Sequence, residues 1–542
     1  MAIIDTDRDD LHALGYAQEL KRGLGGFSNF AISFSIISIL AGGFTGFWIG
    51  ALFGGPLVIT VGWLIVGVFS LLVGMAMGEI CSAYPTAGGL YFWSAKLATK
   101  NAPRWAWFTG WFNFIGQIGV IASVDYALAN YMVALLNLWS KTAIGADGKA
   151  LVDDKGNPII NLIMEPTAKN LFIVFLVMLL IHGLLNTLGV KLVKFLGDVS
   201  VWWHVFGVAI IFVVLLAGPD THQPLSYLFK YQNNSAWSGG ISVLYVFFLG
   251  FLLAQYTITG FDASAHVSEE TKNARVAAPQ AIVRSIWVSA IAALILNIAF
   301  LLAVPNVDGK DQLATLGGTG ITGPVNIFTA VLGSSAAKLI VLISTVGQFF
   351  CGMASVTANS RMIYAFSRDG GLPGSRIWHK INPKTRTPTN AVWLGIAASA
   401  VVGALSLVQH GGVAVAFFAL TGIAVVGLYI SYVIPIYLRL RNPEFKQGPW
   451  NLKGYSRIVG WISIVWVAFI SLLFVAPLFP MWRWWASDDV NTANYTGPLL
   501  FLAFIGVGAW WAASAHNWFT GPKVQGTKEE LMAIERELGE IG

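Results

Sequence analysis

A glycine and a carboxylate interrupt an apolar segment at residues 257–264, which read Thr257-Ile258-Thr259-Gly260-Phe261-Asp262-Ala263-Ser264. The surrounding segment, 241–266, is long and apolar enough to cross a membrane. Glycine tolerates backbone dihedrals that end a helix, and non-helical backbone persists at membrane depth only where it lines protein or a water-filled cavity. The stretch therefore predicts a membrane helix that is broken near its middle, with an ionisable side chain at the break.

The first apolar segment, 27–53, contains a similar interruption, Ser38-Ile39-Leu40-Ala41-Gly42-Gly43-Phe44-Thr45-Gly46. A broken helix presents free N–H groups that suit a carboxylate and free carbonyls that suit an ammonium or another cation. Glycines in a single segment also permit close helix packing without any binding role. Two interruptions at corresponding places, one with an acid, favour a binding site between two broken helices.

Composition places the whole chain in a membrane. Of its 542 residues, 56% are apolar and 11% are charged, whereas soluble domains carry about 25% charged residues. The first 26 residues are polar and lack the basic start and apolar core of a cleaved signal peptide. The net charge of +6 is distributed over loops, so we expect no nucleic-acid partner, and the bilayer is the solvent.

Hydropathy predicts an all-α polytopic membrane protein with about twelve transmembrane helices. The predicted spans are 27–53, 57–83, 105–138, 169–188, 192–217, 241–266, 280–304, 337–366, 389–409, 412–438, 458–480 and 497–519. The two interrupted spans, the first and the sixth, stand at matching places if the chain contains two inverted five-helix repeats. The resulting divisions are a segment 1–26, a first repeat 27–217, a second repeat 241–438, two further helices 458–519 and a tail 520–542.

The loops predict the orientation of these spans. Most of the 33 Lys and Arg residues fall on one side when the N-terminus is placed in the cytoplasm, as the positive-inside rule requires. We therefore expect a multi-pass protein of the cell membrane with cytoplasmic N- and C-termini. Residues 527–541 are predicted to form a short cytoplasmic helix, because Thr527 and Glu530 have capping-box spacing and Leu531 begins an apolar face.

Four motifs occur along the chain. They are Glu79-Ile80-Cys81-Ser82-Ala83-Tyr84-Pro85-Thr86-Ala87-Gly88-Gly89, Gly260-Phe261-Asp262 through Glu269-Glu270-Thr271-Lys272-Asn273 to Pro279, Asn359-Ser360-Arg361 with Ala365 to Pro373, and Gly427-Leu428-Tyr429-Ile430-Ser431-Tyr432. Together they resemble motifs of the amino acid–polyamine–organocation superfamily, and most of all its amino acid/choline transporter branch, which includes 4-aminobutyrate and choline permeases. The resemblance extends from about Gly15 to Pro522.

The resemblance implies a five-plus-five inverted-repeat fold with two more helices, and substrate bound between broken helices 1 and 6. It places the amides of residues 41–43 opposite a substrate carboxylate and the carbonyls of residues 259–261 opposite its amine. Asp262 either binds the ammonium or caps the second half of its helix. The predicted substrate-binding residues are Ser38, Ala41, Gly42, Gly43, Phe44, Thr259, Gly260, Phe261 and Asp262.

Proton coupling is expected at His204 and Ser355. His204 lies where similar members of the superfamily carry a lysine in place of a sodium ion, and Ser355 matches the place of a cation-site hydroxyl. Histidine titrates near pH 6.5 and can carry a proton. His204 could equally be a core residue packed against Trp202 and Trp203, and the departure from lysine leaves sodium coupling open.

Gating is expected at Glu79, Glu269, Glu270 and Arg361. The two adjacent glutamates are predicted to pair with Lys272, Arg275 or arginines of the eighth span as an inner gate. A charged run at the end of a helix is otherwise simply solvated.

The sequence favours secondary transport over other functions. It contains no GxxxxGK[ST] phosphate loop and no HExxH or HxxxH metal spacing, so we expect no ATP-driven pump, no enzyme, no metal and no cofactor. A channel would show a repeated filter or a ring of charges. The predicted function is import of a small amino acid or amine such as 4-aminobutyrate, coupled to protons, by alternating access. Choline, ethanolamine or polyamine transport and sodium-coupled or exchange transport stay open.

Overall fold

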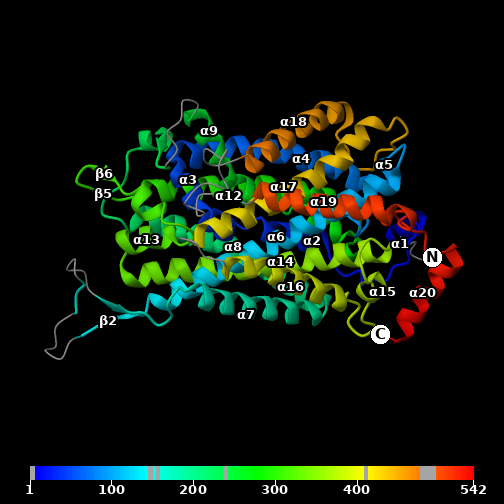
Figure 1. Ribbon diagram of the computed structural model, residues 1–542, viewed down its shortest axis with the longest axis horizontal. Helices are drawn as coiled ribbons and strands as arrows, with labels where there is room; N and C mark the ends of the chain where they lie inside the picture. Colours follow the sequence, from blue (N-terminus) through cyan, green and yellow to red (C-terminus); the bar gives the residue numbers. More distant parts are fainter. Residues whose placement is uncertain are drawn as a thin grey trace.

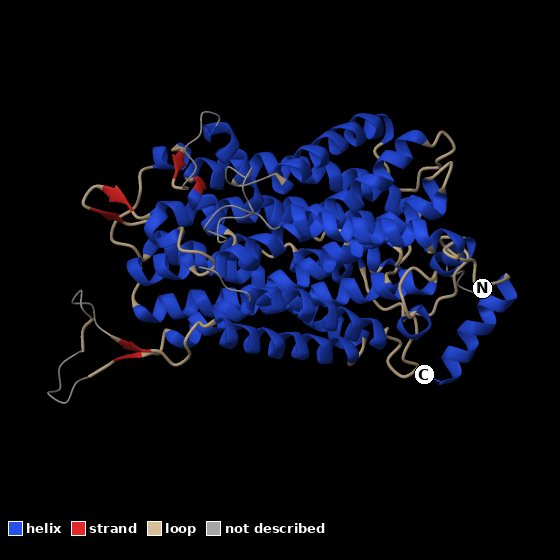
Figure 2. Cartoon of the chain, in the orientation of Figure 1, coloured by secondary structure: helices blue, strands red, loops and turns tan. Residues whose placement is uncertain are grey.

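The protein is a single bundle of helices that run along its long axis (Figure 1). The computed structural model describes residues 6–144, 151–153, 159–235, 242–407, 413–476 and 496–541. Within these ranges, 11 helices are long and apolar enough to cross a membrane, and the strands form only short two-stranded pairs (Figure 2). The prediction of an all-α polytopic membrane protein is confirmed.

The sixth predicted span, which completes the expected twelve, is present but broken. Residues 242–266 form three short helices, α9 (Ser242–Leu249), α10 (Phe251–Thr257) and α11 (Ala263–His266). The first predicted span is divided in the same manner into α2 (Gly26–Ile36), η1 (Ile39–Gly43) and α3 (Phe47–Leu52). The other spans are η2 and α4 (Val58–Gly62, Trp63–Ala83), α6 (Ala102–Asn137), α7 (Ala168–Thr187), α8 (Val190–Ala217), α12 (Ala274–Leu302), α14 (Ser334–Arg368), α16 (Thr389–Gly403), α17 (Val413–Arg441), α18 (Ser456–Val475) and α19 (Thr496–Ala513). The predicted connections around 236–241, 408–412 and 477–495 lie outside the described residues.

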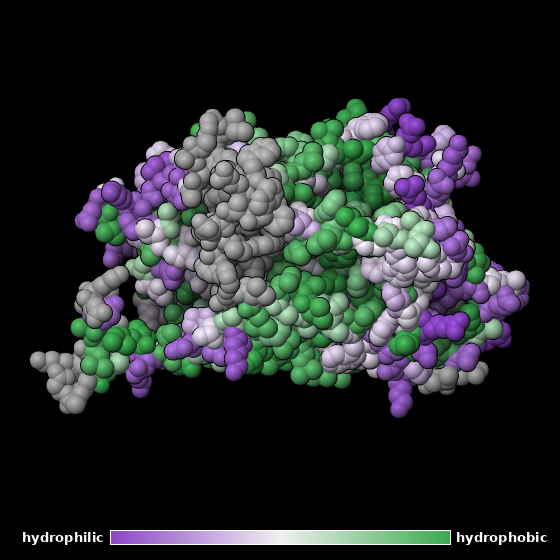
Figure 3. All heavy atoms as spheres, viewed as in Figure 1, coloured by the Kyte–Doolittle hydropathy of each residue, from purple (hydrophilic) through white to green (hydrophobic). Residues whose placement is uncertain are grey.

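The two ends of the bundle differ. One end, here called the terminal end, holds α1 (Thr6–Ala13), α5 (Gly89–Leu97), α15 (Ser375–Trp378) and α20 (Lys528–Ile541) (Figure 1). The opposite hairpin end holds α13 (Gly323–Val331), η5 (Leu313–Gly317) and the pairs β2–β3 (Lys141–Thr142, Ile160–Asn161) and β5–β6 (Asn306–Val307, Lys310–Asp311). Helix α20 confirms the helix predicted from the capping box, and its Leu531 is buried. On the face shown in Figure 3, the coloured surface between the two polar ends is mostly hydrophobic, as a bilayer requires.

Local chemistry explains the two breaks. At the first, Ser38 leaves helical geometry with ψ at 113°, and its side chain accepts a hydrogen bond from the Ala41 N–H at 3.0 Å, which is the role of an N-cap. At the second, Gly260 has φ at +93°, a left-handed conformation that glycine adopts without strain. A Cβ at Gly260 would overlap the side chain of Ile36. Glycine is therefore required both by the turn and by the close approach of the two breaks.

A cluster of hydrogen bonds around Asp311, here called the latch, joins two loops at the hairpin end. Asp311 of β6 accepts hydrogen bonds from Tyr227 at 3.0 Å, Lys230 at 3.1 Å and Gln232 at 2.7 Å, and Gln232 also belongs to β4 (Gln232–Asn233), which pairs with β1 (Phe53–Gly54). Burial alone would raise the pKa of the Asp311 carboxyl, but these donors and the charge of Lys230 hold that pKa below its ordinary value. The carboxylate is therefore ionised at neutral pH.

Replacing Asp311 with Asn should loosen this latch. A hydrogen bond to a charged group contributes about 1.5–3 kcal/mol, so we expect faster amide hydrogen exchange in β5–β6 and around Tyr227, with unchanged exchange in the core helices. The matched control is Asp308→Asn, because Asp308 is exposed in the same hairpin. Equal exchange in the two variants would show that Asp311 does not hold the two loops together.

Candidate binding site at the two helix breaks

The two breaks touch at the centre of the bundle. A Cβ at Gly42 would lie 2.8 Å from the Cα atom of Thr257, so the backbones of η1 and α10 are in direct contact. Two cavities of about 10 Å³ lie beside the crossing, each large enough for about one water molecule. Ligand pockets for small molecules usually have about 300–1,000 Å³, so binding an amino acid requires the breaks to move apart.

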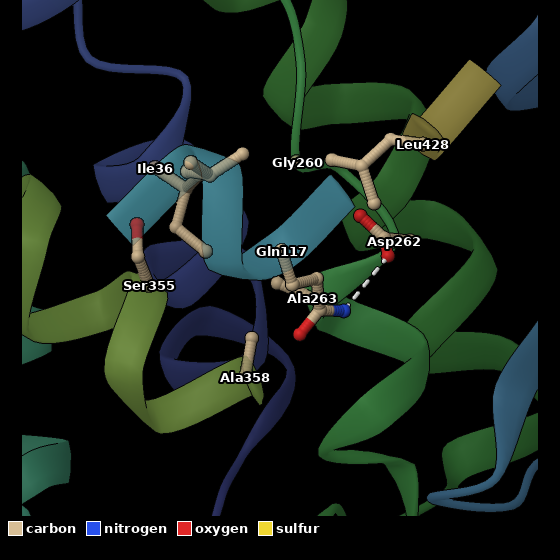
Figure 4. Close-up of a pocket in the computed structure, with 9 residues that line it drawn as sticks. Ile36, Gln117, Gly260, Asp262, Ala263, Ser355, Ala358 and Leu428 are labelled. Carbon is tan, nitrogen blue, oxygen red and sulfur yellow. Dashed lines mark hydrogen bonds between the residues drawn. The ribbon is translucent and has the colours of Figure 1, made fainter. Parts of the chain in front are cut away.

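Asp262 is the centre of the hydrogen-bond network at the second break, and Figure 4 shows its bond to Gln117 beside the cavity. Its Oδ1 accepts from the Tyr432 hydroxyl of α17 at 2.7 Å, and its Oδ2 accepts from Asn113 and Gln117 of α6 at 3.1 and 3.2 Å. The side chain is 1% exposed and lines one of the two cavities. A buried carboxylate is costly unless it is paired and hydrogen-bonded, and these donors supply part of that compensation.

His266 contacts the same carboxylate from the next turn of the chain. Its Nδ1 lies 2.9 Å from the carbonyl oxygen of Ala87, which can only accept, so Nδ1 carries a hydrogen. Its Nε2 lies 3.2 Å from Asp262 Oδ2. A neutral ring of this tautomer would turn an acceptor toward the ionised carboxylate, so the contact between Nε2 and Oδ2 is a hydrogen bond only when a proton lies between them. The pair is therefore a place where a proton can be held beside Asp262.

The predicted substrate-binding residues fall into two groups. Gly42 and Thr259 line the second cavity, and Gly260 and Asp262 line the first. The amides of Ala41 and Gly42 donate to Ser38 within the turn, so a substrate carboxylate would have to replace these bonds.

The remaining members surround these cavities without lining them. The carbonyl of Phe261 accepts from Ser33 at 3.0 Å, and its ring lies 4.9 Å from that of Tyr432. Phe44 packs against Phe300, with 5.2 Å between the two ring centres. A Cβ added at Gly43 would meet its nearest atom, in the Ile39 side chain, at 3.8 Å, so Gly43 does not form the contact between the breaks.

His204 of α8 is hydrogen-bonded directly to the first break. Its Nδ1 donates to the carbonyl of Ser200 at 2.8 Å, so a neutral ring presents Nε2 as an acceptor to the Ser38 hydroxyl at 2.6 Å. The same Ser38 oxygen accepts from the Ala41 amide. Protonation of His204 would make Nε2 a donor, so the Ser38 hydroxyl would accept this hydrogen bond instead of donating it.

Ser355 lies away from His204. It donates to the Cys351 carbonyl at 2.8 Å and lines the cavity of Asp262.

The predicted gating residues form ion pairs at the terminal end. Glu270 pairs with Arg361 at 2.7 Å, and Glu269 pairs with Arg368 at 3.1 Å. The eighth-span arginines of α14 are thus the partners, while Arg275 pairs with Asp10 at 3.3 Å. The side chains of these four residues are at most 4% exposed. They therefore form two buried ion pairs and are not a solvated helix end.

Glu79 belongs to a separate cluster. It pairs with Arg439 of α17 at 3.0 Å and accepts from Gln447 at 2.8 Å and from the Ser456 hydroxyl. These contacts join α4 to α17 and α18, so Glu79 fastens the helices beside the gate and does not contact Glu269 or Glu270 through any described hydrogen bond.

The chain before α2 covers the gate. Gln18 donates to the Glu269 carbonyl at 2.8 Å, and the amides of Gly23 and Leu24 donate to the Glu270 carbonyl at 3.0 and 2.9 Å. Helix α20 packs against this segment, because Glu535 of α20 lies 2.6 Å from His12 of α1. Any separation of these ion pairs that moves the backbone of Glu269 and Glu270 would therefore also disturb the N-terminal segment.

Sequence reasoning missed several residues of the Asp262 network. Asn113 and Gln117 stand one helical turn apart in an apolar span, which is itself a signal for a buried polar site. His266 follows Asp262 by four residues and therefore lies on the same helical face. Tyr432 ends a motif that was recognised in the sequence, but nothing in its spacing indicates that it reaches a carboxylate in the sixth span.

Gly42→Ala is expected to disrupt the site, whereas Gly43→Ala is not. The new Cβ at residue 42 would meet the backbone of Thr257, so α10 would have to shift. Such overpacking costs about 1–3 kcal/mol, measurable as a lower thermal unfolding midpoint together with reduced uptake. Gly43→Ala is the matched control, and equal behaviour of the two variants would show that the breaks do not rely on this contact.

Comparison with known proteins agrees with the geometry. A family model described as amino acid permease matches residues 24–509. The amino-acid permease BAT1 of Arabidopsis thaliana is 40% identical over 535 residues, which cover 96% of this chain and 97% of that protein. A putative polyamine transporter of Candida albicans is 28% identical over 557 residues, which cover 98% of this chain and 91% of that protein. The resemblance found in the sequence is confirmed, and the chain belongs to the amino acid permease family.

Proposed function

We propose that this permease imports a small amino acid or amine such as 4-aminobutyrate, together with a proton, by alternating access between its two ends. The observation that carries the proposal is the buried Asp262 carboxylate, which lines a cavity at the crossing of two broken helices. A carboxylate at that place suits a substrate ammonium, while the amides of η1 suit a carboxylate at the other end of the substrate.

The substrate class follows from the charges at the site. Asp262 is the only acidic side chain that lines either of the two described cavities, so a compact substrate with one ammonium fits better than a long polyamine. The Arabidopsis relative named an amino-acid permease is more similar to this chain than the Candida relative named a putative polyamine transporter. Choline or ethanolamine is the second candidate, because the Ala41 and Gly42 amides are already satisfied by Ser38 and do not require a carboxylate.

Two arrangements support a coupled proton. His204 is hydrogen-bonded to the hydroxyl of Ser38 at the first break, and a proton can lie between Asp262 and His266 at the second. Each connects protonation to a segment that must move when substrate binds. Ser355, on the wall of the Asp262 cavity, adds a hydroxyl at the same site; sodium is the competing ion.

The remaining proposals concern the repeats, the orientation in the membrane and the inner gate. We propose that 27–217 and 241–438 are inverted repeats, with their breaks crossing at the centre, and that 458–519 adds two helices at the periphery. The terminal end would face the cytoplasm of the cell, because the loops there are rich in Lys and Arg. The Glu270–Arg361 and Glu269–Arg368 pairs would then be the inner gate.

The test is uptake of labelled 4-aminobutyrate by purified protein in liposomes. An inward-acid pH gradient should accelerate uptake, and an unlabelled competitor series of amino acids, choline, ethanolamine and polyamines should identify the preferred class. Acceleration by sodium alone would refute proton coupling and keep the permease. Absence of uptake of every amine would refute the proposed substrate class.

His204→Gln is expected to flatten the pH dependence of uptake, because Gln accepts from Ser38 but does not titrate. Uptake by the wild type should rise as pH falls, because protonation of His204 would change its hydrogen bond to Ser38. The control is His222→Gln, an exposed histidine at the hairpin end. A pH profile like that of the wild type would return His204 to a packing role and assign the proton to the Asp262–His266 pair.

A further inference from the structure

A basic cleft lies between the first and seventh spans at the terminal end. It has a volume of about 220 Å³ and is lined by Gly26 and Phe30 of α2 and by Lys272, Asn273, Gln280 and Arg284 on and before α12, with Val276, Ala277 and Ala281 as its apolar wall. Lys272 and Arg284 are exposed. Although twelve residues apart in sequence, their long side chains line the same cleft.

The acids near this cleft form ion pairs with residues other than Lys272 and Arg284. Among the residues that the structure describes, no carboxylate lies within ion-pair distance of Lys272 or Arg284. Asp7 caps the start of α12, where it accepts from the Asn273 amide at 2.7 Å, and it pairs with Arg22 at 3.2 Å. Asp10 pairs with Arg275 at 3.3 Å. Asp198 of α8 accepts from Ser28 at 3.2 Å. The cleft therefore presents two cations that the described part of the chain does not neutralise.

Arg284 lies in an unusual place for such a charge. It is ten residues beyond the start of α12, or about 15 Å along the helix axis, within a segment apolar enough to span the membrane. An arginine on such a surface extends toward the head-group layer, which is where the cleft and Lys272 lie. The neighbouring surface is aromatic, because Phe27 and Trp287 are each nearly half exposed.

We propose that this cleft binds the phosphate of an anionic glycerophospholipid, with Lys272 and Arg284 as its ligands and an acyl chain along Phe27 and Phe30. Guanidinium binds phosphate through paired hydrogen bonds, and basic pockets between membrane helices on the cytoplasmic side are suited to anionic head groups. The proposal rests on the cytoplasmic orientation inferred above, and it requires no particular transport substrate.

The position of the cleft connects the lipid to the gate. The Lys272 amide donates to the Leu24 carbonyl at 2.9 Å, where the chain enters α2, and Glu270 of the gate is two residues away. A phosphate held between α2 and α12 would fasten the start of the first broken helix to the seventh span. Anionic lipid is therefore expected to stabilise the closed gate.

The experiment measures the thermal unfolding midpoint of the full chain in detergent, titrated separately with phosphatidylglycerol, phosphatidylcholine and inorganic phosphate. Phosphatidylglycerol should raise the midpoint at a concentration at least about tenfold lower than phosphatidylcholine, a preference of about 1.4 kcal/mol, because the choline cation offsets the phosphate charge. The variant Lys272→Gln/Arg284→Gln should lose this preference. The control variant Arg376→Gln/Lys380→Gln removes two exposed charges elsewhere at the terminal end and should keep it.

Three outcomes would overturn the proposal. Equal responses of the wild type to the two lipids would show no head-group selectivity, and this comparison needs no variant. A shift reproduced by inorganic phosphate at the same concentration would indicate a free-anion site. An undiminished preference in Lys272→Gln/Arg284→Gln would place lipid binding elsewhere. Since no transported substrate is added, failure of 4-aminobutyrate uptake leaves these results interpretable.

Discussion

Asp262→Asn is expected to reduce uptake of the amine substrate by about 30-fold to several thousand-fold. Removing one member of a buried charge pair costs about 2–5 kcal/mol, and each 1.4 kcal/mol is about a factor of ten. The loss has two parts: the substrate ammonium loses its counter-ion, and the new amide hydrogens face Asn113 and Gln117, which point donors at the same place.

The measurement is initial uptake rate in liposomes together with the thermal shift caused by substrate in detergent. Asp308→Asn is the matched control, because Asp308 is exposed at the hairpin end. The thermal shift separates a binding defect from a defect in helix movement, since only the former abolishes substrate-dependent stabilisation. Uptake by folded Asp262→Asn at the wild-type rate would refute a substrate-binding role for the carboxylate. It would leave Asp262 as a structural acceptor for Tyr432 and Asn113, because its side chain does not cap α11 in the structure.

His266 makes this variant informative about the proton as well. With Asn at residue 262, no carboxylate faces Nε2 of His266, and the pair can no longer hold a proton between an imidazole and a carboxyl group. Any residual uptake should therefore be less sensitive to an inward-acid gradient than uptake by the wild type. Undiminished gradient sensitivity would assign the coupled proton to His204 alone.

Sequence patterns predicted the broken helices because the physics at those residues is local. Gly260 needs a positive φ, and Ser38 caps the turn that follows it; both requirements can be read from residue type and hydropathy. The sequence offers Glu269 and Glu270 three sets of basic partners: Lys272, Arg275 and the arginines of the eighth span. Residue type does not distinguish between these partners. The choice of the α14 arginines depends on how the helices pack in the folded chain.

The Asp262 network could not be predicted in full because its donors come from elements distant in the chain. Asn113 and Gln117 belong to α6 and Tyr432 to α17, and helix rotation decides which of their polar faces points toward the sixth span. Ser355 shows the same limit. Its resemblance to a cation-site hydroxyl did not indicate its neighbours, and in the structure it lines the cavity of Asp262, while Ser38 contacts His204.

Arg361→Gln is expected to open the gate at the terminal end. Glu270 and Arg361 are each only 1% exposed, and breaking a buried ion pair by removing one partner costs about 3–5 kcal/mol because the other charge stays buried and unpaired. The conformation that hydrates Glu270 should therefore gain population by about 100-fold to several thousand-fold relative to the closed one. The expected result is faster modification of the pathway by reagents in water.

Cys351 is a native reporter for this opening. Its thiol donates to the Ile36 carbonyl at 3.3 Å and lines a cavity at the crossing of the breaks, so it is protected while the gate is closed. In a Cys81→Ser background, alkylation of Cys351 by a small thiol reagent should be much faster in Arg361→Gln than in the parent, and unchanged in the surface control Arg376→Gln. The double variant Glu270→Gln/Arg361→Gln should return toward the alkylation rate of the parent, because two neutral side chains can stay buried.

If the double variant reacted as fast as Arg361→Gln, the closed gate would depend on contacts of Arg361 other than Glu270, such as its bond to Ser360.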